Sequence, residues 1–330
     1  MAEISYEVLG IGNAIVDVLA PAEDAFLEEH GMVKGSMALI DDQKAEELYA
    51  AMGSGTEVSG GSAANTVAGV AALGGRACFL GKVRDDQLGQ TFSNDIRNIG
   101  VDFPSELAAD GAPTARCLIA VTPDAMRTMN TFLGACVELG PDDVDEALVA
   151  ASAITYLEGY LWDPPRAKEA FLKAMDAARR AGRQVALSLS DGFCVDRHRD
   201  EFMDLVQHQV DILFANEQEI ISLYEAETFD AAMQSVRGHC EIAAVTRAEK
   251  GAVITTKDEV HIIDAEPIDT VVDTTGAGDL FAAGFLMGHA TGRSLPECGR
   301  MAGITAAEAI SHMGARPETD LRALMKEKLV

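Results

Sequence analysis

From residue 154 onward the sequence alternates between short apolar runs and longer amphipathic segments, and this alternation limits the fold more than any other feature. Apolar runs at 154–160, 184–190 and 211–215 are typical of buried strands, and the segments 165–181 and 199–207 between them are predicted as helices. Strands that alternate with helices form a parallel sheet with helices on both faces. We therefore expect an α/β fold with a doubly wound, mostly parallel sheet.

The rest of the sequence adds further β/α units and two segments, 16–40 and 107–135, that do not follow this alternation. Further helices are expected at 25–30, 41–52, 86–99, 277–292, 295–312 and 318–328, and further strands at 7–12, 36–40, 77–83, 115–121, 126–133, 242–246, 252–256 and 259–263. The residues Thr122 to Ala125 predict a hairpin turn. We expect one large domain (1–15, 41–106 and 136–330) and a small β-rich lid formed by two inserts (16–40 and 107–135).

Composition restricts the partners and the compartment. Among 330 residues, 26 are basic and 53 acidic, and the net charge of −27 is unfavourable for binding to nucleic acids or anionic membranes. The six cysteines are scattered and form no Cys-x-x-Cys pair, which indicates reduced thiols. The N-terminus lacks the features of a signal peptide, and no run is apolar enough to span a membrane. We expect a cytoplasmic protein, whose oligomeric state the sequence does not indicate.

A glycine-containing stretch near the end of the chain carries the strongest chemical signal. Residues 273–279 read Asp-Thr-Thr-Gly-Ala-Gly-Asp, with the apolar β-like pair Val271–Val272 before them and a helix of low polarity after them. Backbone N–H groups at such a helix start bind anions. Asp279 would repel a phosphate there, so it indicates a general base that takes a proton from a hydroxyl while the amides hold a transferring phosphoryl group. The alternative is an aspartate that only caps the helix.

Several polar residues at predicted strand ends are candidates for binding a substrate. Asn13 and Asp17 follow the first strand, where ligands bind in open α/β sheets. Gly60 and Gly61 permit close approach of a ligand, and Asn65 can contact a sugar hydroxyl, although tight helix packing explains this stretch equally well. A further candidate is Glu158, a carboxylate that interrupts an apolar run.

Three more residues have a functional and a structural interpretation. Arg127 on the predicted hairpin is a candidate clamp for phosphate, while a solvated arginine is the commoner case. Asn216 and Glu219 have the spacing of a capping box, and they are also oxygen ligands of the kind that Mg²⁺ and its waters prefer. From the local sequence alone, the cap is favoured.

The sequence contains no Gly-x-x-x-x-Gly-Lys-Ser/Thr, Gly-x-Gly-x-x-Gly, His-Glu-x-x-His or Gly-x-Ser-x-Gly motif, so phosphate must be bound in another way. Residues 273–284 resemble the C-terminal signature of the ribokinase-like (PfkB) sugar and nucleoside kinases, and residues 60–89 resemble their N-terminal signature. This resemblance covers nearly the whole chain. The segments 59–66, 127–130 and 156–162 are most similar to the bacterial adenosine kinases. Ribokinases usually have a lysine within the N-terminal Gly-Gly motif, where this chain has Ser62.

The resemblance implies roles for individual residues. The general base falls on Asp279, the anion hole on the backbone of Gly276, Ala277 and Gly278, and the grip on the substrate on Asp17, Gly61 and Asn65. Residues implied in nucleotide binding are Asn216, Glu219, Thr246, Gly251, Thr275, Gly276 and Gly278. Asn216 and Glu219 match the family's Asn-x-x-Glu motif near magnesium. The family's Thr-x-Gly-x-x-Gly pattern is matched only in part, because Ala248 stands at its first glycine. A monovalent cation, K⁺, is implied near Asp269 and Thr275.

Together these features predict a kinase that uses ATP and Mg²⁺ to phosphorylate the 5′-hydroxyl of adenosine, giving AMP and ADP. Arg127 would stabilise charge on the transferring phosphoryl group. One alternative is a sugar kinase of the same family, of the ribokinase or fructokinase type. The other is a regulatory protein that binds a nucleoside without catalysis.

Overall fold

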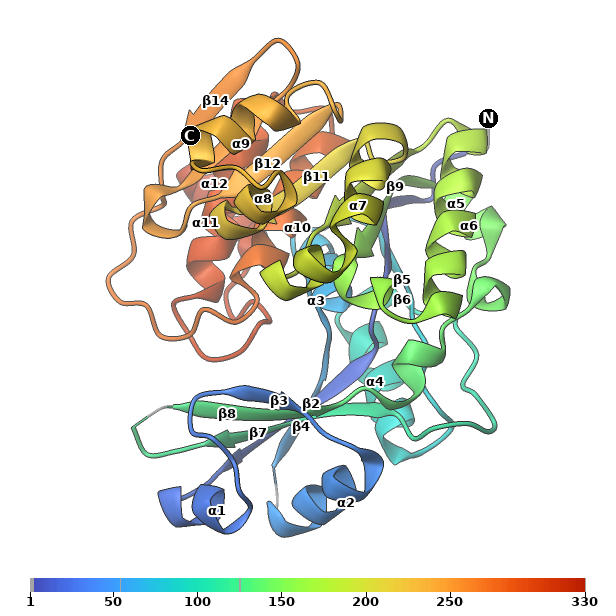
Figure 1. The fold of residues 1–330 in the computed structure, drawn as a ribbon, viewed down its shortest axis with the longest axis vertical. Coiled ribbons are helices and arrows are strands. Elements are labelled where there is room, and N and C mark those ends of the chain that lie inside the picture. Colours follow the sequence, from blue (N-terminus) through green and yellow to red (C-terminus); the bar gives the residue numbers. More distant parts are fainter. Residues whose placement is uncertain (1–2, 54, 125, 330) are drawn as a thin grey trace.

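The computed structural model describes residues 3–53, 55–124 and 126–329, and its centre is a nine-stranded sheet (Figure 1). The strands of this sheet are, in chain order, β1 (Tyr6–Ile11), β5 (Ala77–Leu80), β6 (Val101–Asp102), β9 (Ser152–Glu158), β10 (Gln184–Ser188), β11 (Ile212–Asn216), β12 (Ile242–Thr246), β13 (Ala252–Thr255) and β14 (Val260–Ile263). Their spatial order is β14-β13-β12-β11-β10-β9-β1-β5-β6. From β6 to β12 neighbouring strands are parallel, and only β13 and β14 pair antiparallel.

Helices cover both faces of this sheet. These are α3 (Ser62–Ala72), α4 (Gln87–Asn98), α5 (Glu146–Ala150), α6 (Pro165–Ala181), α7 (Gly192–His208), α8 (Glu217–Leu223), α9 (Phe229–Val236), α10 (Ala277–Ala290), α11 (Leu295–Ala309) and α12 (Leu321–Lys328), whereas α1 (Asp24–Glu29) and α2 (Asp42–Ala51) lie with a second, small sheet (Figure 1). One core packs α3, α4, α10, α11 and α12 against one face, and a second packs α5 to α9 against the other. Adjacent residues of β1, Val8 and Leu9, belong to different cores, because successive side chains of a strand point to opposite faces. The predicted doubly wound α/β fold is confirmed.

A second, five-stranded sheet lies beyond the carboxyl ends of the large sheet (Figure 1). Its strands are β2 (Ile15–Pro21), β3 (Met37–Leu39), β4 (Thr56–Gly60), β7 (Ala115–Val121) and β8 (Arg127–Phe132), in the order β3-β8-β7-β2-β4. The expected boundaries assigned residues 41–106 to the large domain. The structure instead pairs β4 antiparallel with β2 and packs α2 on β7 and β8, so residues 42–51 and 56–60 lie with the small sheet.

Most predicted elements occur near their expected bounds, and the differences have local causes. Helix α7 begins at Gly192 rather than 199, because Asp191 caps it and its backbone is non-helical only at His198. The pair Val271–Val272 is not a strand: both valines are about half exposed, and the Val272 N–H donates to Ile310 O instead of a neighbouring strand. The last residue of the predicted hairpin turn, Ala125, lies outside the described residues.

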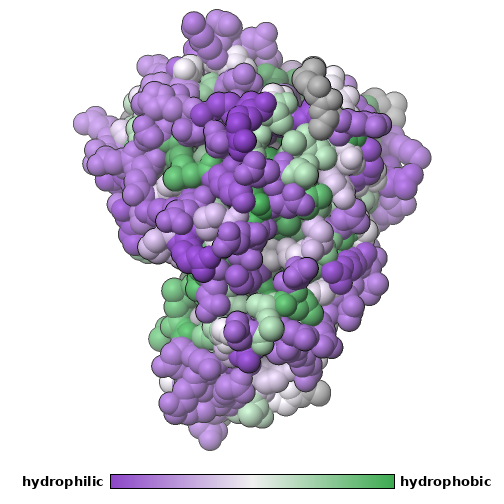
Figure 2. All heavy atoms as spheres, turned by 90° about the vertical axis from the view of Figure 1, so that its right-hand side faces the viewer, coloured by the Kyte–Doolittle hydropathy of each residue, from purple (hydrophilic) through white to green (hydrophobic). Residues whose placement is uncertain are grey.

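Polar and charged side chains dominate the face drawn in Figure 2, where apolar residues form separate patches. This agrees with the net charge of −27. Among the helices of residues 3–53, 55–124 and 126–329, none is both long enough and apolar enough to cross a membrane. All six cysteines are free thiols, as the sequence indicated.

Candidate active site

Asp279 lies in the first turn of α10 and is held by two side chains of α3. Its Oδ1 accepts a hydrogen bond from Ser62 Oγ at 2.6 Å, and its Oδ2 accepts one from Asn65 Nδ2 at 2.9 Å. Burial raises the pKa of Asp279, while the bonds from Ser62 and Asn65 and the charge of Arg316 act to lower it. The carboxylate is therefore oriented by two donors, which is the arrangement that a general base requires. The sequence did not indicate Ser62 as one of these donors.

The glycine loop before α10 exposes backbone donors. Gly276 is the N-cap of α10 with φ +78° and ψ 0°, a left-handed conformation that suits glycine. Within the described residues, the N–H groups of Gly276 and Gly278 donate to no acceptor, whereas Ala277 N donates to Thr274 O at 3.3 Å. Two of the three predicted amides are thus available to an anion at a helix N-terminus.

Arg127 brings the small sheet into contact with this loop. Its Nη1 forms an ion pair with Asp273 Oδ2 and lies 3.3 Å from Thr275 Oγ1, and both charged side chains are nearly buried. Although burial acts to raise the pKa of Asp273, hydrogen bonds from Gly314 and Thr275 and the charge of Arg127 hold it below its usual range. The structure therefore places Arg127 beside the predicted phosphate loop, with Asp273 as its counter-ion.

Asp17 and the paired glycines lie at the junction of the two sheets. A Cβ at Gly60 would be 2.5 Å from Asp17 Oδ2, and one at Gly61, where φ is +104°, would be 2.1 Å from Asn13 O. Burial raises the pKa of Asp17 to about 6, against the charges of Arg316 and Arg127. In the part of the chain that the structure describes, this carboxylate accepts no hydrogen bond, so its oxygens are available to a hydroxyl of a ligand.

Glu158 lies beneath the site rather than in it. Its Oε1 accepts bonds from Asn13 N (2.8 Å) and Nδ2 (2.6 Å), its Oε2 accepts one from Ala63 N (2.7 Å), and the residue is 0% exposed. Burial raises its pKa to about 7. This carboxylate joins the end of β1, the start of α3 and β9, and so it has no surface left for the direct substrate contact that we expected.

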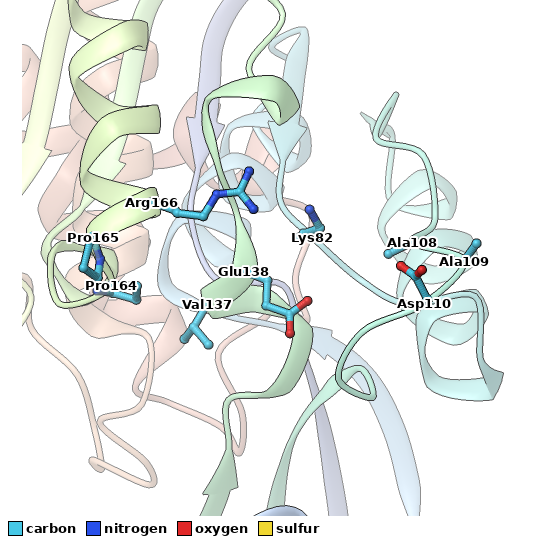
Figure 3. A pocket seen from close by; sticks show the side chains of 9 residues that line it. All are labelled: Lys82, Ala108, Ala109, Asp110, Val137, Glu138, Pro164, Pro165 and Arg166. Carbon is cyan, nitrogen blue, oxygen red and sulfur yellow. The ribbon is translucent and has the colours of Figure 1, made fainter.

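A cavity of about 490 Å³ elsewhere in the molecule is not part of this site. It is lined by Lys82, Ala108, Ala109, Asp110, Val137, Glu138, Pro164, Pro165 and Arg166 (Figure 3). Its two basic and two acidic side chains balance in charge, and none of the predicted site residues lines it.

A larger cavity, of about 810 Å³, lies beside the N-terminus of α10. Asn216, Thr246, Gly251 and Gly278 line it, as predicted, together with Ala277; its volume is in the range of small-ligand sites. Three other residues that the sequence assigned to nucleotide binding, Glu219, Thr275 and Gly276, do not line it. In the sequence, each of the three is the direct neighbour of a residue that lines the cavity.

Asn216 and Glu219 form a complete capping box at the start of α8. Asn216 Oδ1 accepts from Glu219 N at 2.9 Å, while Glu219 accepts from Asn216 N and Nδ2 at 2.9 and 2.6 Å. Burial raises the pKa of Glu219 to about 7. No group of three or more His, Cys, Asp or Glu side chains within the described residues has the arrangement of a metal site.

The presence of Ala248 at the first glycine of the Thr-x-Gly-x-x-Gly pattern has a structural consequence. Ala248 has φ +50°, a left-handed conformation that costs a non-glycine residue about 1–2 kcal/mol. Nearby, Gly251 has φ +80°, and a Cβ there would be 2.0 Å from Ile263 O. The loop therefore keeps a shape suited to two glycines although only one is present.

The pfkB family carbohydrate kinase model matches residues 32–321 of the chain. The chain belongs to the PfkB family. As a member of this kinase family it is a phosphotransferase that acts on a hydroxyl acceptor, and ATP with Mg²⁺ is the phosphoryl donor that the family implies.

Individual PfkB kinases are similar over nearly the full length. The chain is 52% identical to the adenosine kinase from Sinorhizobium meliloti (TM-score 0.89, covering 98% of this chain and 99% of that one). It is 50% identical to a probable sugar kinase from Rhizobium etli CFN 42 (TM-score 0.90, 98% of both chains). It is 26% identical to the adenosine kinase of Saccharomyces cerevisiae over 92% of this chain and 94% of that protein. The resemblance to bacterial adenosine kinases is confirmed.

Four carboxyls, of which Glu158 and Glu219 are buried and Asp17 and Asp279 partly buried, predict how the stability of this PfkB kinase depends on pH. Burial raises the pKa of Asp279, of Asp17 to about 6, and of Glu158 and Glu219 to about 7. Because these folded pKa values exceed the unfolded ones, the contribution of each group to stability is complete below its unfolded pKa and is lost as the pH rises through its folded pKa, about 6 for Asp17 and about 7 for Glu158 and Glu219. Glu158 alone accounts for on the order of 3 kcal/mol as an upper bound. Burial lowers the pKa of His289, which makes its contribution to stability rise with pH, but this is one group against the four carboxyls.

The measurement is the free energy of unfolding from denaturant titrations at pH 5 and pH 8, and it should be lower at pH 8. Glu158→Gln removes one of the titrating groups and should reduce the difference between the two values. A free energy of unfolding that rises between pH 5 and pH 8 would contradict the assignment.

Proposed function

We propose that the chain transfers the γ-phosphate of ATP·Mg²⁺ to the 5′-hydroxyl of adenosine, giving AMP and ADP. The observation that carries this proposal is the Asp279 carboxylate, held by Ser62 and Asn65 beside the unpaired N–H groups of Gly276 and Gly278. Asp279 takes the proton of the attacking hydroxyl, and the two amides, with Ala277 at the same turn, stabilise the charge that develops on the phosphoryl group. The similarity to the S. meliloti adenosine kinase supports adenosine as acceptor.

The ribose of the acceptor would bind between the two sheets. Asp17 accepts hydrogen bonds from ribose hydroxyls, and Gly60 and Gly61 let the backbone pass close to Asp17 and Asn13. Two amide oxygens near this point, Asn13 Oδ1 and Asn65 Oδ1, are buried without a hydrogen-bond partner in the described structure. Such groups are costly to leave unpaired, and hydroxyl donors of a sugar would satisfy them. Glu158 acts indirectly, by fixing Asn13 and the start of α3.

The nucleotide would occupy the 810 Å³ cavity, with Asn216, Thr246 and Gly251 along its walls and its phosphates toward Gly278 and Thr275. Mg²⁺ supplies charge neutralisation on these phosphates. Both oxygens of Glu219 already accept bonds from Asn216, so the pair fits water-mediated contact with the ion better than direct coordination. A K⁺ ion near Asp269 and Thr275 is a further part of the proposal, which the same assay tests by exchanging K⁺ for Na⁺.

Arg127 would exchange partners when phosphate binds. Its ion pair with Asp273 holds a cation beside the loop, where it can reach the transferring group and so neutralise charge in the transition state. Asp273 keeps its bonds from Gly314 and Thr275 and so remains anchored when Arg127 turns away.

This activity places the chain in purine salvage, and its free cysteines and acidic surface suit a cytoplasmic enzyme that binds neither nucleic acids nor membranes.

The test is ADP formation with a panel of acceptors: adenosine, other nucleosides, ribose and fructose. We expect kcat/KM for adenosine to exceed that for either sugar by about 100-fold or more, because a site that hydrogen-bonds a particular substrate strongly rejects analogues that leave its polar groups unpaired. A preference for fructose or ribose would favour the sugar-kinase alternative, which the similarity to the R. etli protein keeps open. Adenosine binding by calorimetry without ADP formation from any acceptor would indicate a nucleoside-binding regulator.

A further inference from the structure

Arg316 is a partly buried cation in the loop between α11 and α12, and its hydrogen bonds go only to neutral groups. Nη1 donates to Ala64 O at 2.9 Å, Nη2 donates to Ser59 O at 2.8 Å and Ser59 Oγ at 3.1 Å, and Nε donates to Ser59 O at 3.2 Å. No carboxylate in the described residues lies within ion-pair distance of it. A guanidinium without a contact ion pair in such a place is costly, so its charge must be compensated from further away.

The carbonyls that Arg316 binds flank the segment that positions Asp279. Ser59 is the penultimate residue of β4, Ala64 lies in the first turn of α3, and between them stand the paired glycines and Ser62, whose hydroxyl donates to Asp279. Ser59 is also held from the other side, because its N–H and Oγ both donate to Asp95 Oδ2 at 2.8 and 2.6 Å. The position of the Ser62 donor thus depends on this clamp.

The loop that carries Arg316 is itself anchored on both sides. Gly314 N donates to Asp273 Oδ2 at 2.9 Å, and Glu308 Oε1 accepts from Glu318 N and Thr319 N, each at 2.9 Å. Arg316 is therefore held rigidly, and its charge has a fixed place relative to the glycine loop.

Two of the three carboxylates whose charges act on Arg316 belong to the site. The charges that act on Arg316 are those of Asp95, Asp17 and Asp279, and in return Arg316 lowers the pKa of both Asp17 and Asp279. Asp279 also shares this region with Glu158 on β9 and with Asp17 on β2, whose negative charges oppose its ionisation. Among the charged neighbours of Asp279, Arg316 is the one whose positive charge lowers the pKa of this carboxyl.

We propose that Arg316 is a positioning residue for phosphoryl transfer: it supplies positive charge to the region of the Asp279 carboxylate and holds the start of α3 where Ser62 and Asn65 meet that carboxylate. Arg316 is not among the residues that line the 810 Å³ cavity. The proposal rests on Asp279 as general base, and so on the proposed function.

The test compares two variants that lose the same geometry but differ in charge. Arg316→Gln is neutral, whereas Arg316→Lys keeps the charge and loses the forked contact with Ser59 and Ala64. Both should lower kcat. Because loss of a nearby positive charge disfavours the ionised carboxylate, only Arg316→Gln should move the acid limb of the kcat profile to higher pH, so that its activity at pH 6 relative to pH 8 falls roughly tenfold below that of Arg316→Lys.

A purely structural arginine would lower the thermal stability of both variants and leave both acid limbs in place, which would overturn the proposal. If Arg316→Gln does not fold, the neutral Arg316→Met takes its place in the same comparison with Arg316→Lys, and an acid limb that coincides with that of the wild type in this variant refutes the electrostatic role. Loss of the Arg316 charge would also raise the pKa of Asp17. The pH profile is therefore measured as kcat at saturating acceptor, and it is repeated with Asp17→Asn added to each of the two Arg316 variants.

Failure of the proposed function gives a different result. If the wild-type chain phosphorylates no acceptor, adenosine kinase activity is refuted. The effect of Arg316 is then measured by NMR titration of aspartate labelled with ¹³C at Cγ, with Asp279→Asn to assign the resonance. An Asp279 resonance that titrates at the same pH in the wild type and in Arg316→Gln would refute the role of Arg316.

Discussion

Asp279→Asn is expected to lower kcat for adenosine by about 10²- to 10⁴-fold while the dissociation constant of adenosine changes little. The substitution removes the proton acceptor but keeps the shape of the side chain. An asparagine can accept from Asn65 Nδ2 with its oxygen and donate to Ser62 Oγ with its amide, so both contacts of the carboxylate have replacements. Turnover comes from rapid-quench and steady-state kinetics, and affinity from calorimetry.

The stability of this variant provides an internal control. The negative charge of Asp279 raises the pKa of Asp17 and Glu158, which shows that the three carboxylates oppose one another. Removal of one charge should therefore leave the melting temperature unchanged or higher, the usual relation between stability and activity at a strained site. An inactive variant that also melts well below the wild type would point to misfolding instead of a lost base.

Asp17→Asn is the matched comparison, because Asp17 is predicted to hold the sugar and not to move the proton. Its main effect should be weaker binding of adenosine, with a smaller change in kcat than in Asp279→Asn. If both variants lost kcat equally and kept their affinity, the division of roles between the two carboxylates would be wrong.

The sequence predicted those parts of the fold that have local signals. Helix α6 occupies its predicted bounds because Pro165 starts it and Gly182, in the left-handed conformation, ends it. The capping box at Asn216 was likewise readable from four adjacent residues. Strand β4 was missed, because Thr56–Gly60 is a strand only through its pairing with β2.

The contacts within the site could not be read from the sequence, since they join residues far apart in the chain. Ser62 and Asn65 lie more than 200 positions before Asp279, and Arg316 lies more than 250 positions after Ser59. Glu158 shows the limit of the local argument most clearly. Its place in an apolar run predicted a carboxylate that binds substrate, and the structure shows it accepting hydrogen bonds from the N–H groups of Asn13 and Ala63.

Two substitutions in the glycine loop are expected to change stability in opposite directions while both impair phosphoryl transfer. In Gly276→Ala, the left-handed backbone costs about 1–2 kcal/mol, and the new Cβ would be 2.5 Å from Ala315 Cβ and 2.8 Å from Ala315 Cα. Relief of this overlap must displace the loop. The Gly276 N–H then leaves its place, and kcat should fall by about 10²- to 10³-fold, as when a donor to the transition state is lost. The melting temperature should fall as well.

Gly278→Ala is the matched control in the same turn. No atom lies within 4 Å of a Cβ at this position, and alanine in a helix is favoured over glycine by up to about 1 kcal/mol, so the melting temperature should stay the same or rise slightly. Because Gly278 lines the 810 Å³ cavity, however, the added methyl group takes space beside the phosphates, and KM for ATP should increase. An unchanged KM for ATP would mean that the nucleotide does not approach this turn.

For Gly276→Ala, a melting temperature and a kcat equal to those of the wild type would contradict the argument that the left-handed glycine determines the conformation of the loop.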